Sequence, residues 1–127
     1  MNELTSLLYV DDEPLNTMLF KAYFKQIFNV YICDSGIKGL EKLRLNPEIR
    51  VVISDMKMPN MNGIEFIRLA KSEFPNIAYF ILTGYDINEE ITNALNSNLI
   101  LKYFRKPFNE REIEKTIKDF LQNQNNI

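Results

Sequence analysis

Short apolar segments alternate with segments of helical periodicity along this chain, five of each. The apolar segments, rich in β-branched residues, predict strands at residues 6–10, 29–33, 51–54, 77–82 and 99–104. Apolar side chains spaced three and four residues apart predict helices at 14–28, 35–45, 63–74, 87–95 and 110–121. Such an alternation implies a parallel sheet covered by helices on both faces. The 127 residues are therefore expected to form one α/β domain, with a core of about residues 5–122 and a short polar C-terminal tail.

The strand order follows from how parallel strands are connected. Crossover connections are right-handed, which limits the possible windings. Five strands with helices on both faces favour a three-layer sandwich with the flavodoxin-like order 2-1-3-4-5. In that order the first and third strands are neighbours, and ligands bind outside the carboxyl ends of the strands at this point.

Composition excludes several classes of function. A net charge of −2 argues against binding nucleic acid or anionic membranes by bulk electrostatics. The chain has no histidine, which excludes histidine-dependent catalytic triads and histidine-ligated zinc. A single cysteine, Cys33, cannot form an internal disulfide. No apolar run approaches the ~20 residues that span a bilayer, and the N-terminus does not resemble a signal peptide. A cytoplasmic protein is expected.

Polar residues stand where four of the five predicted strands end. The first strand runs into Asp11 and Asp12, the third into Asp55, the fourth into Thr83, and the fifth into Lys106. Parallel strands end at one edge of a sheet, so these side chains are expected to share a pocket. Three clustered carboxylates repel one another unless a cation is present. Oxygen ligands alone suit Mg²⁺, with Mn²⁺ as a possible substitute.

This set of residue types is suited to phosphoryl transfer. A carboxylate can attack phosphorus and become an aspartyl phosphate. Lys106 supplies a positive charge for the new phosphoryl group and Thr83 a hydroxyl, while Gly84 leaves room and offers a backbone N–H. Each of these residues alone is more commonly structural, and it is their joint position at the strand ends that indicates a site.

The segments LLYVDDEP, VVISDMKMPNMNG, YFILTGY and YFRKPF, in this order and spacing, resemble the receiver domain of two-component response regulators. The resemblance covers residues 5–122. It implies that Asp55 is the phosphoacceptor, that Asp11, Asp12 and Asp55 hold Mg²⁺ together with the backbone carbonyl of Lys57, and that Thr83 and Lys106 contact the phosphoryl oxygens. The resemblance also implies a cis bond before Pro107.

The same resemblance implies a switch and its partners. The phosphoryl group, taken from a phosphohistidine of a sensor kinase or phosphotransfer protein, would draw Thr83 inwards and let Tyr103 turn from exposed to buried. The partner-binding surface of the fourth helix, fifth strand and fifth helix would then change. Such a chain catalyses only its own phosphorylation and dephosphorylation. A monomer and a phosphorylation-dependent homodimer both remain possible, as do a stand-alone receiver and an N-terminal domain of a longer regulator.

Two other functions compete with this one. The first is a small aspartyl-phosphate phosphatase of the haloacid-dehalogenase type, which needs Asp-x-Asp followed by Gly and Thr, whereas this chain has DDEPL. The second is a receiver-like interaction module that is never phosphorylated. Modules of that kind usually lose one of the five site residues, and all five are present here. A flavodoxin would need a Ser/Thr- and Gly-rich phosphate loop after the first strand, which DDEPLN is not.

Lys57 and Tyr85, two residues after the acceptor and two after Thr83, occupy positions that tune phosphoryl lifetime in the family. A bulky Tyr85 is expected to shield the phosphorus from water. Tyr85→Ala should therefore dephosphorylate faster than the wild type, measured as loss of the phosphoryl adduct over time. A variant no faster than the wild type would contradict this hypothesis.

Overall fold

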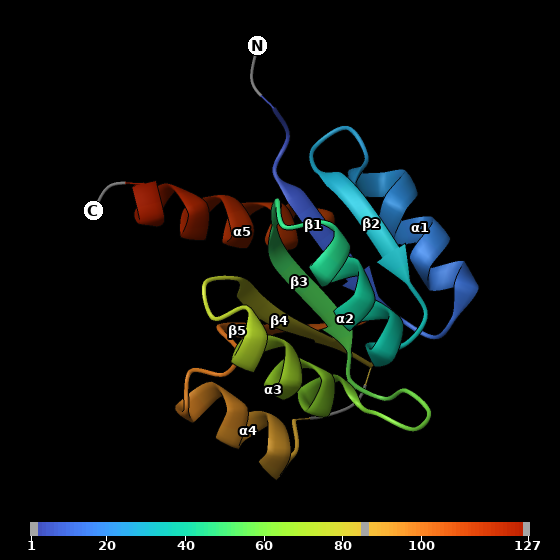
Figure 1. Cartoon of the computed structure of the whole chain (residues 1–127). Helices are drawn as coiled ribbons and strands as arrows, with labels where there is room; N and C mark the ends of the chain where they lie inside the picture. The colour runs from blue at the N-terminus through green and yellow to red at the C-terminus, as the bar shows by residue number, and fades with distance from the viewer. Residues whose placement is uncertain (1–2, 85–86, 126–127) are drawn as a thin grey trace.

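The computed structural model describes residues 3–84 and 87–125, and its centre is a parallel five-stranded sheet (Figure 1). The strands lie in the order β2-β1-β3-β4-β5, as predicted. Their bounds are β1 Ser6–Val10, β2 Asn29–Cys33, β3 Ile49–Asp55, β4 Ala78–Thr83 and β5 Lys102–Arg105. This order places β1 and β3 side by side, paired from Leu7 with Val51 to Val10 with Ser54.

Helices cover both faces of the sheet (Figure 1). One face carries α2 (Gly36–Leu45), α3 (Gly63–Glu73) and α4 (Glu89–Asn96), and the other carries α1 (Pro14–Phe24) and α5 (Glu110–Asn125). Successive strand residues point to opposite faces, so the central strands are apolar throughout. In β1, Leu8 and Val10 pack toward α2 and α3, whereas Leu7 and Tyr9 pack toward α1 and α5.

Several element boundaries differ from the prediction. The first helix ends at Phe24 rather than at residue 28, because the chain turns there and returns Phe28 to the core, with its N–H bonded to the Phe24 carbonyl at 2.8 Å. The last strand begins at Lys102 rather than at residue 99, because the preceding N–H groups of Leu99 and Ile100 bond to the carbonyl of Ala94 at the end of α4.

Two cap-like pairs in the sequence, Asp86 with Glu89 and Asn109 with Glu112, predict the starts of the last two helices. Asn109 caps α5, accepting the N–H of Glu112 at 3.0 Å as expected. For α4 the expected cap, Asp86, lies outside the described residues. The helix begins at Glu89 and its cap is Asn88, which accepts the N–H of Ile91.

The buried face of α2 also differs from the sequence pattern. The three-residue spacing of Ile37, Leu40 and Leu43 suggests one apolar stripe, but Ile37 is 60% exposed. Gly36 and Gly39 join Leu40 and Leu43 on the buried side. Small residues let α2 lie close to α3, and the spacing of apolar side chains alone does not show this.

The described residues contain no helix with the length and apolar character that a bilayer crossing requires.

Gly63, the first residue of α3, fixes the loop behind Asp55. Its N–H bonds to the Met56 carbonyl at 2.8 Å, and Asn62 with Glu65 forms a capping box around it. A β-carbon at Gly63 would lie 2.3 Å from the backbone oxygen of Asp55 and 2.8 Å from Ile81 Cδ1. Only glycine allows the helix to start this close to the end of β3.

Gly63→Ala is therefore expected to destabilise the fold by about 1–3 kcal/mol, the usual cost of overpacking. Gly84→Ala is a matched control, because its β-carbon would meet Lys106 only at 3.8 Å. Urea unfolding of both variants measures the difference. Equal midpoints for Gly63→Ala and the wild type would contradict the close approach.

Candidate functional site

The carboxyl ends of β1, β3, β4 and β5 meet at one edge of the sheet (Figure 1). Asp11 follows β1 directly, Asp55 is the last residue of β3, Thr83 is the last residue of β4, and Lys106 follows β5. The parallel register sets Asp55 beside Leu82 and Thr83 beside Arg105. The predicted site residues are thus brought together from segments far apart in the sequence.

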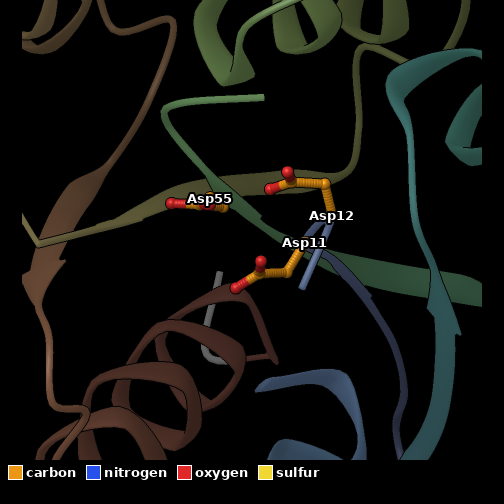
Figure 2. Close-up of side chains that lie close together, drawn as sticks. All are labelled: Asp11, Asp12 and Asp55. Carbon is orange, nitrogen blue, oxygen red and sulfur yellow. The ribbon is translucent and has the colours of Figure 1, made fainter. Parts of the chain in front are cut away.

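Three carboxylates gather at this edge (Figure 2). Asp11, Asp12 and Asp55 each present one oxygen, and these oxygens lie within 4.8 Å of one another. Asp11 is fully buried, Asp55 is 6% exposed, and Asp12 is half-buried. The acidic cluster is therefore compact and open to solvent mainly on the side of Asp12.

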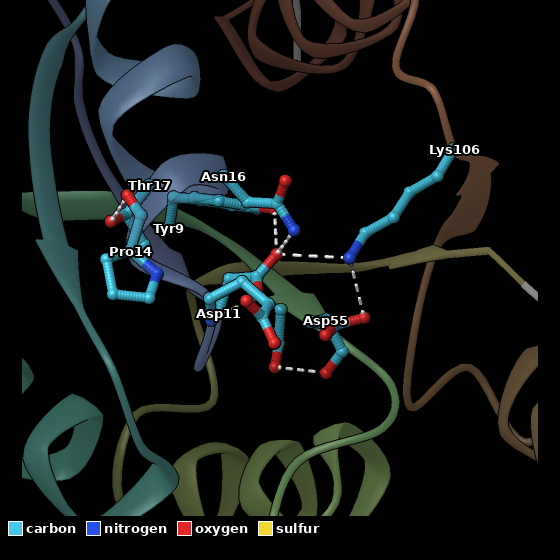
Figure 3. Close-up of polar contacts among 9 residues, drawn as sticks. Tyr9, Asp11, Pro14, Asn16, Thr17, Asp55 and Lys106 are labelled. Atoms are coloured by element: carbon cyan, nitrogen blue, oxygen red, sulfur yellow. Dashed lines mark hydrogen bonds and ion pairs between the residues drawn. The ribbon is translucent and has the colours of Figure 1, made fainter.

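Lys106 is the cation that faces this cluster (Figure 3). Its Nζ lies 3.1 Å from Asp11 Oδ2 and 3.2 Å from Asp55 Oδ1. Burial opposes a charged ammonium, but the charges of Asp55 and Asp11 outweigh it and raise the pKa of Lys106. Lys106 therefore stays protonated and neutralises one of the three negative charges.

The pKa of Asp55 reflects this buried, acidic environment. Burial, and next the negative charge of Asp11, raise the pKa of Asp55 to about 6, although Lys106 acts in the opposite direction. Desolvation and a like charge both disfavour the ionised carboxylate. One lysine is thus insufficient to balance the cluster, and a further cation would be stabilised here.

Asp11 is held by a set of donors that sequence reasoning missed (Figure 3). Its Oδ2 accepts from the Tyr9 hydroxyl at 2.6 Å, from Asn16 Nδ2 at 3.2 Å and from Lys106 Nζ. Its Oδ1 accepts the N–H of Glu13 at 3.0 Å. One signal was available: Tyr9 and Asp11 are two residues apart, which directs both to the same face of the sheet.

Tyr9 keeps its proton in this position. Burial, followed by the hydrogen bond and the charge of Asp11, raises the pKa of Tyr9 well above its usual range. The ring is 1% exposed and stacks on Phe20, with centroids 4.2 Å apart and planes 9° from parallel. The hydroxyl therefore acts as a donor.

A hollow of about 680 Å³ opens in front of the cluster. Its lining includes Asp12, Asp55 and Lys106, together with Lys57, Met58 and Gly84. The exposed Lys57 thus borders the site, as expected of a residue that follows the acceptor in the loop. Tyr85, the other expected neighbour, lies outside the described residues.

Thr83 and Tyr103 lie on the opposite face of the sheet from Lys106. In β4, Tyr79, Ile81 and Thr83 point toward α3 and α4, and Tyr103 pairs with Ile81 and packs on the same face. Thr83 is 1% exposed and Tyr103 is half-buried. The two residues expected to form a switch are therefore diagonal neighbours on one face.

The loop after β5 is tied to the end of β4. The N–H of Lys106 bonds to the Thr83 carbonyl at 2.8 Å. The Lys106–Pro107 peptide bond is cis, as predicted. The backbone bond holds Lys106 and Thr83 next to each other although 22 intervening residues separate them in the sequence.

Comparison with known proteins agrees with this geometry. The family model described as "Response regulator receiver domain" matches residues 7–118. Sporulation initiation phosphotransferase F of Bacillus subtilis is 30% identical over 123 residues, covering 95% of each chain. The hydrogenase transcriptional regulatory protein HoxA of Bradyrhizobium diazoefficiens is 26% identical over 117 residues. That match covers 92% of this chain but only 24% of the longer protein.

Solved structures give the same result. A response regulator receiver domain protein from Clostridium thermocellum superposes with a TM-score of 0.84 at 28% identity, covering 96% of this chain and 98% of that one. The chemotaxis protein CheY4 of Vibrio cholerae superposes with a TM-score of 0.82 at 24% identity, which shows the fold. Because the family model matches residues 7–118, a range that includes all the strand-end residues of the site, this chain belongs to the response regulator receiver domain family.

Proposed function

We propose that this chain is a phosphorylation-controlled receiver in which Asp55 accepts a phosphoryl group from a phosphohistidine. One observation carries the proposal: Asp55 ends β3 at the mouth of a hollow, with Lys106 at 3.2 Å and two further carboxylates beside it. The name of the Bacillus subtilis relative, a phosphotransferase, supports the same chemistry, since the two chains match over 95% of their lengths.

The donor set fits Mg²⁺ or Mn²⁺. Asp11, Asp12 and Asp55 offer hard oxygen atoms within 4.8 Å of one another, and burial together with the negative charge of Asp11 raises the pKa of Asp55. The backbone carbonyl of Lys57 would complete the protein ligands. When bound, the ion would neutralise the carboxylates and the incoming phosphoryl oxygens.

Asp55, Lys106 and Thr83 would each have a separate role in the phosphoryl transfer. An Asp55 oxygen attacks phosphorus while the P–N bond to the donor imidazole breaks and its electron pair returns to the ring nitrogen. Lys106, already 3.2 Å from Asp55, stays within reach of the phosphoryl oxygens and counters their charge. The Thr83 hydroxyl then donates to the phosphoryl group from the other side.

The Thr83 movement would transmit the change to a binding surface. A hollow of about 450 Å³ lies between the loop that follows β3 and the start of α4, and Thr83 lines it together with Asn88, Glu90 and Ile91. Movement of Thr83 toward the phosphoryl group empties space on this face, and the half-buried Tyr103 can turn inward. The surface of α4, β5 and α5 would then favour a different partner.

In this proposal the chain is not an enzyme that turns over an external substrate, because it catalyses only its own phosphorylation and dephosphorylation. Its partners would be a sensor histidine kinase or phosphotransfer protein and a downstream protein. Neither nucleic acid nor a membrane would be bound directly. The chain itself would act in the cytoplasm.

Incubation with acetyl phosphate and Mg²⁺ should add one phosphoryl group to the wild type, because Asp55 is the aligned nucleophile. Intact-mass spectrometry should detect the adduct. Asp55→Asn should give none. Asp34→Asn, which removes a carboxylate that pairs with Lys38 on the surface, should be phosphorylated normally. Omitting Mg²⁺ should suppress the adduct.

Failure of the folded wild type to gain an adduct would overturn the proposal in favour of an interaction module that is never phosphorylated. An equal adduct in Asp55→Asn would place the acceptor elsewhere. Steady release of phosphate from a generic phosphomonoester would instead favour the phosphatase.

Removing the Asp55 charge should stabilise the metal-free protein. The folded pKa of Asp55 is about 6, above its usual value, so its contribution is fully present at low pH and is lost as pH rises through 6. At pH 7.5 without Mg²⁺, Asp55→Asn should exceed the wild type by about 1–3 kcal/mol, since one pKa unit corresponds to ~1.4 kcal/mol.

Urea unfolding from pH 4.5 to 7.5 measures this difference, which should shrink toward low pH. Saturating Mg²⁺ should stabilise the wild type more than the variant. A variant less stable than the wild type at pH 7.5 would show that the Lys106 ion pair outweighs the repulsion.

A further inference from the structure

Two hollows open beside the acidic cluster at the carboxyl edge of the sheet. One is the hollow of about 680 Å³ that contains Asp12 and Asp55. The other, of about 530 Å³, is lined by Tyr9, Asn16 and Lys106. These three residues are the donors to Asp11 Oδ2. Asp11 Oδ2 is therefore held by Tyr9 and Asn16, which line the second hollow, and by Lys106, which lines both hollows and also pairs with Asp55.

The donors are unequally shared between the two oxygens of Asp11. Oδ2 receives three donors, more than the two lone-pair sites of one carboxylate oxygen, so it has no site left for a cation. Oδ1 receives one donor, the N–H of Glu13, and keeps a lone pair for a further partner. The protein thus selects which oxygen of Asp11 is available to a cation.

Among these donors the Tyr9 hydroxyl is the best placed to fix the carboxylate. Its 2.6 Å bond is the shortest of the three, and a bond to an ionised acceptor is stronger than one between neutral groups. The ring cannot shift, because it is buried and stacked on Phe20. Asn16 and Lys106 are more exposed than Tyr9, and their bonds to Oδ2 are longer, at 3.2 Å and 3.1 Å.

We infer that Tyr9 is a positioning residue for the cation site: its hydroxyl, anchored by the stack on Phe20, holds Asp11 Oδ2 and leaves Oδ1 available to the ion. This inference rests on the proposed function, because it requires that the acidic cluster binds Mg²⁺. Packing alone does not require the hydroxyl, since phenylalanine would fill the same space and keep the stack.

Two effects oppose each other when the hydroxyl is removed. Fewer donors leave more negative charge on Asp11, which favours Mg²⁺. A carboxylate that is no longer oriented must lose more conformational entropy when it binds, which disfavours Mg²⁺. Loss of a group that hydrogen-bonds to a metal ligand usually weakens metal binding by about 10–100-fold, so orientation is expected to dominate.

The test compares Tyr9→Phe with Tyr79→Phe. Tyr79 is also 1% exposed and donates its hydroxyl to a backbone carbonyl, that of Phe74 at 2.8 Å, so the control removes one buried hydroxyl bond away from the site. Isothermal titration of Mg²⁺ into the full chain should give a dissociation constant at least about tenfold weaker for Tyr9→Phe. Tyr79→Phe should match the wild type.

A kinetic readout separates positioning from general damage. With acetyl phosphate as donor, the Mg²⁺ concentration for half-maximal phosphorylation should rise in Tyr9→Phe by the same factor as the dissociation constant. The rate at saturating Mg²⁺ should return to near the wild-type value. A rate that stays low at saturating Mg²⁺, or an unchanged or tighter dissociation constant, overturns the inference.

A measurement on the wild type keeps the inference testable if Tyr9→Phe does not fold. The ¹³Cζ resonance of a tyrosine reports on the hydrogen bond of its hydroxyl. Mg²⁺ should shift the Tyr9 resonance and leave that of Tyr79 in place, and an unmoved Tyr9 resonance at saturating Mg²⁺ overturns the inference. A wild type that binds no Mg²⁺ at all would instead refute the proposed metal site itself.

Discussion

The ion pairs of Lys106 with Asp11 and Asp55 hold the carboxyl edge of the sheet together, with Nζ 3.1 Å and 3.2 Å from the two carboxylates. Two nearly buried acids on adjacent strands would otherwise repel each other where desolvation strengthens the repulsion. Burial and the charge of Asp11 still raise the pKa of Asp55, although Lys106 acts in the opposite direction. The site is therefore folded yet electrostatically unsatisfied, which is the state that favours binding a cation.

The rest of the architecture brings these charges to one place. Parallel pairing of β1 with β3 sets Asp11 and Asp55 side by side, and pairing of β4 with β5 brings Lys106 to the same edge. Gly63 lets α3 start against the Asp55 carbonyl, which shapes the loop behind the acceptor. The site thus depends on the sheet register, and small shifts of one strand would separate its members.

Because side chains alternate along the strands, the residues of the site are distributed over both faces of the sheet. Tyr9, Asp11 and Lys106 face the side of α1 and α5, where the charges are anchored. Thr83 and Tyr103 face α3 and α4, and Thr83 lines a hollow on that face. The proposed switch residues and the residues that anchor the charges therefore lie on opposite faces of the sheet.

The sequence by itself determined the number and order of the elements, because buried parallel strands are apolar throughout and helices keep their own period. It also indicated Asp11, Asp12, Asp55, Thr83 and Lys106, since polar residues at four strand ends are hard to explain otherwise. Helix and strand ends were less accurate, as at Phe24 and Lys102, because packing and returning turns decide where an element stops. Only the tertiary structure decided how Asp11 is held: the stack of Tyr9 on Phe20 and the approach of Lys106 join segments distant in the chain, and no local pattern encodes such distances.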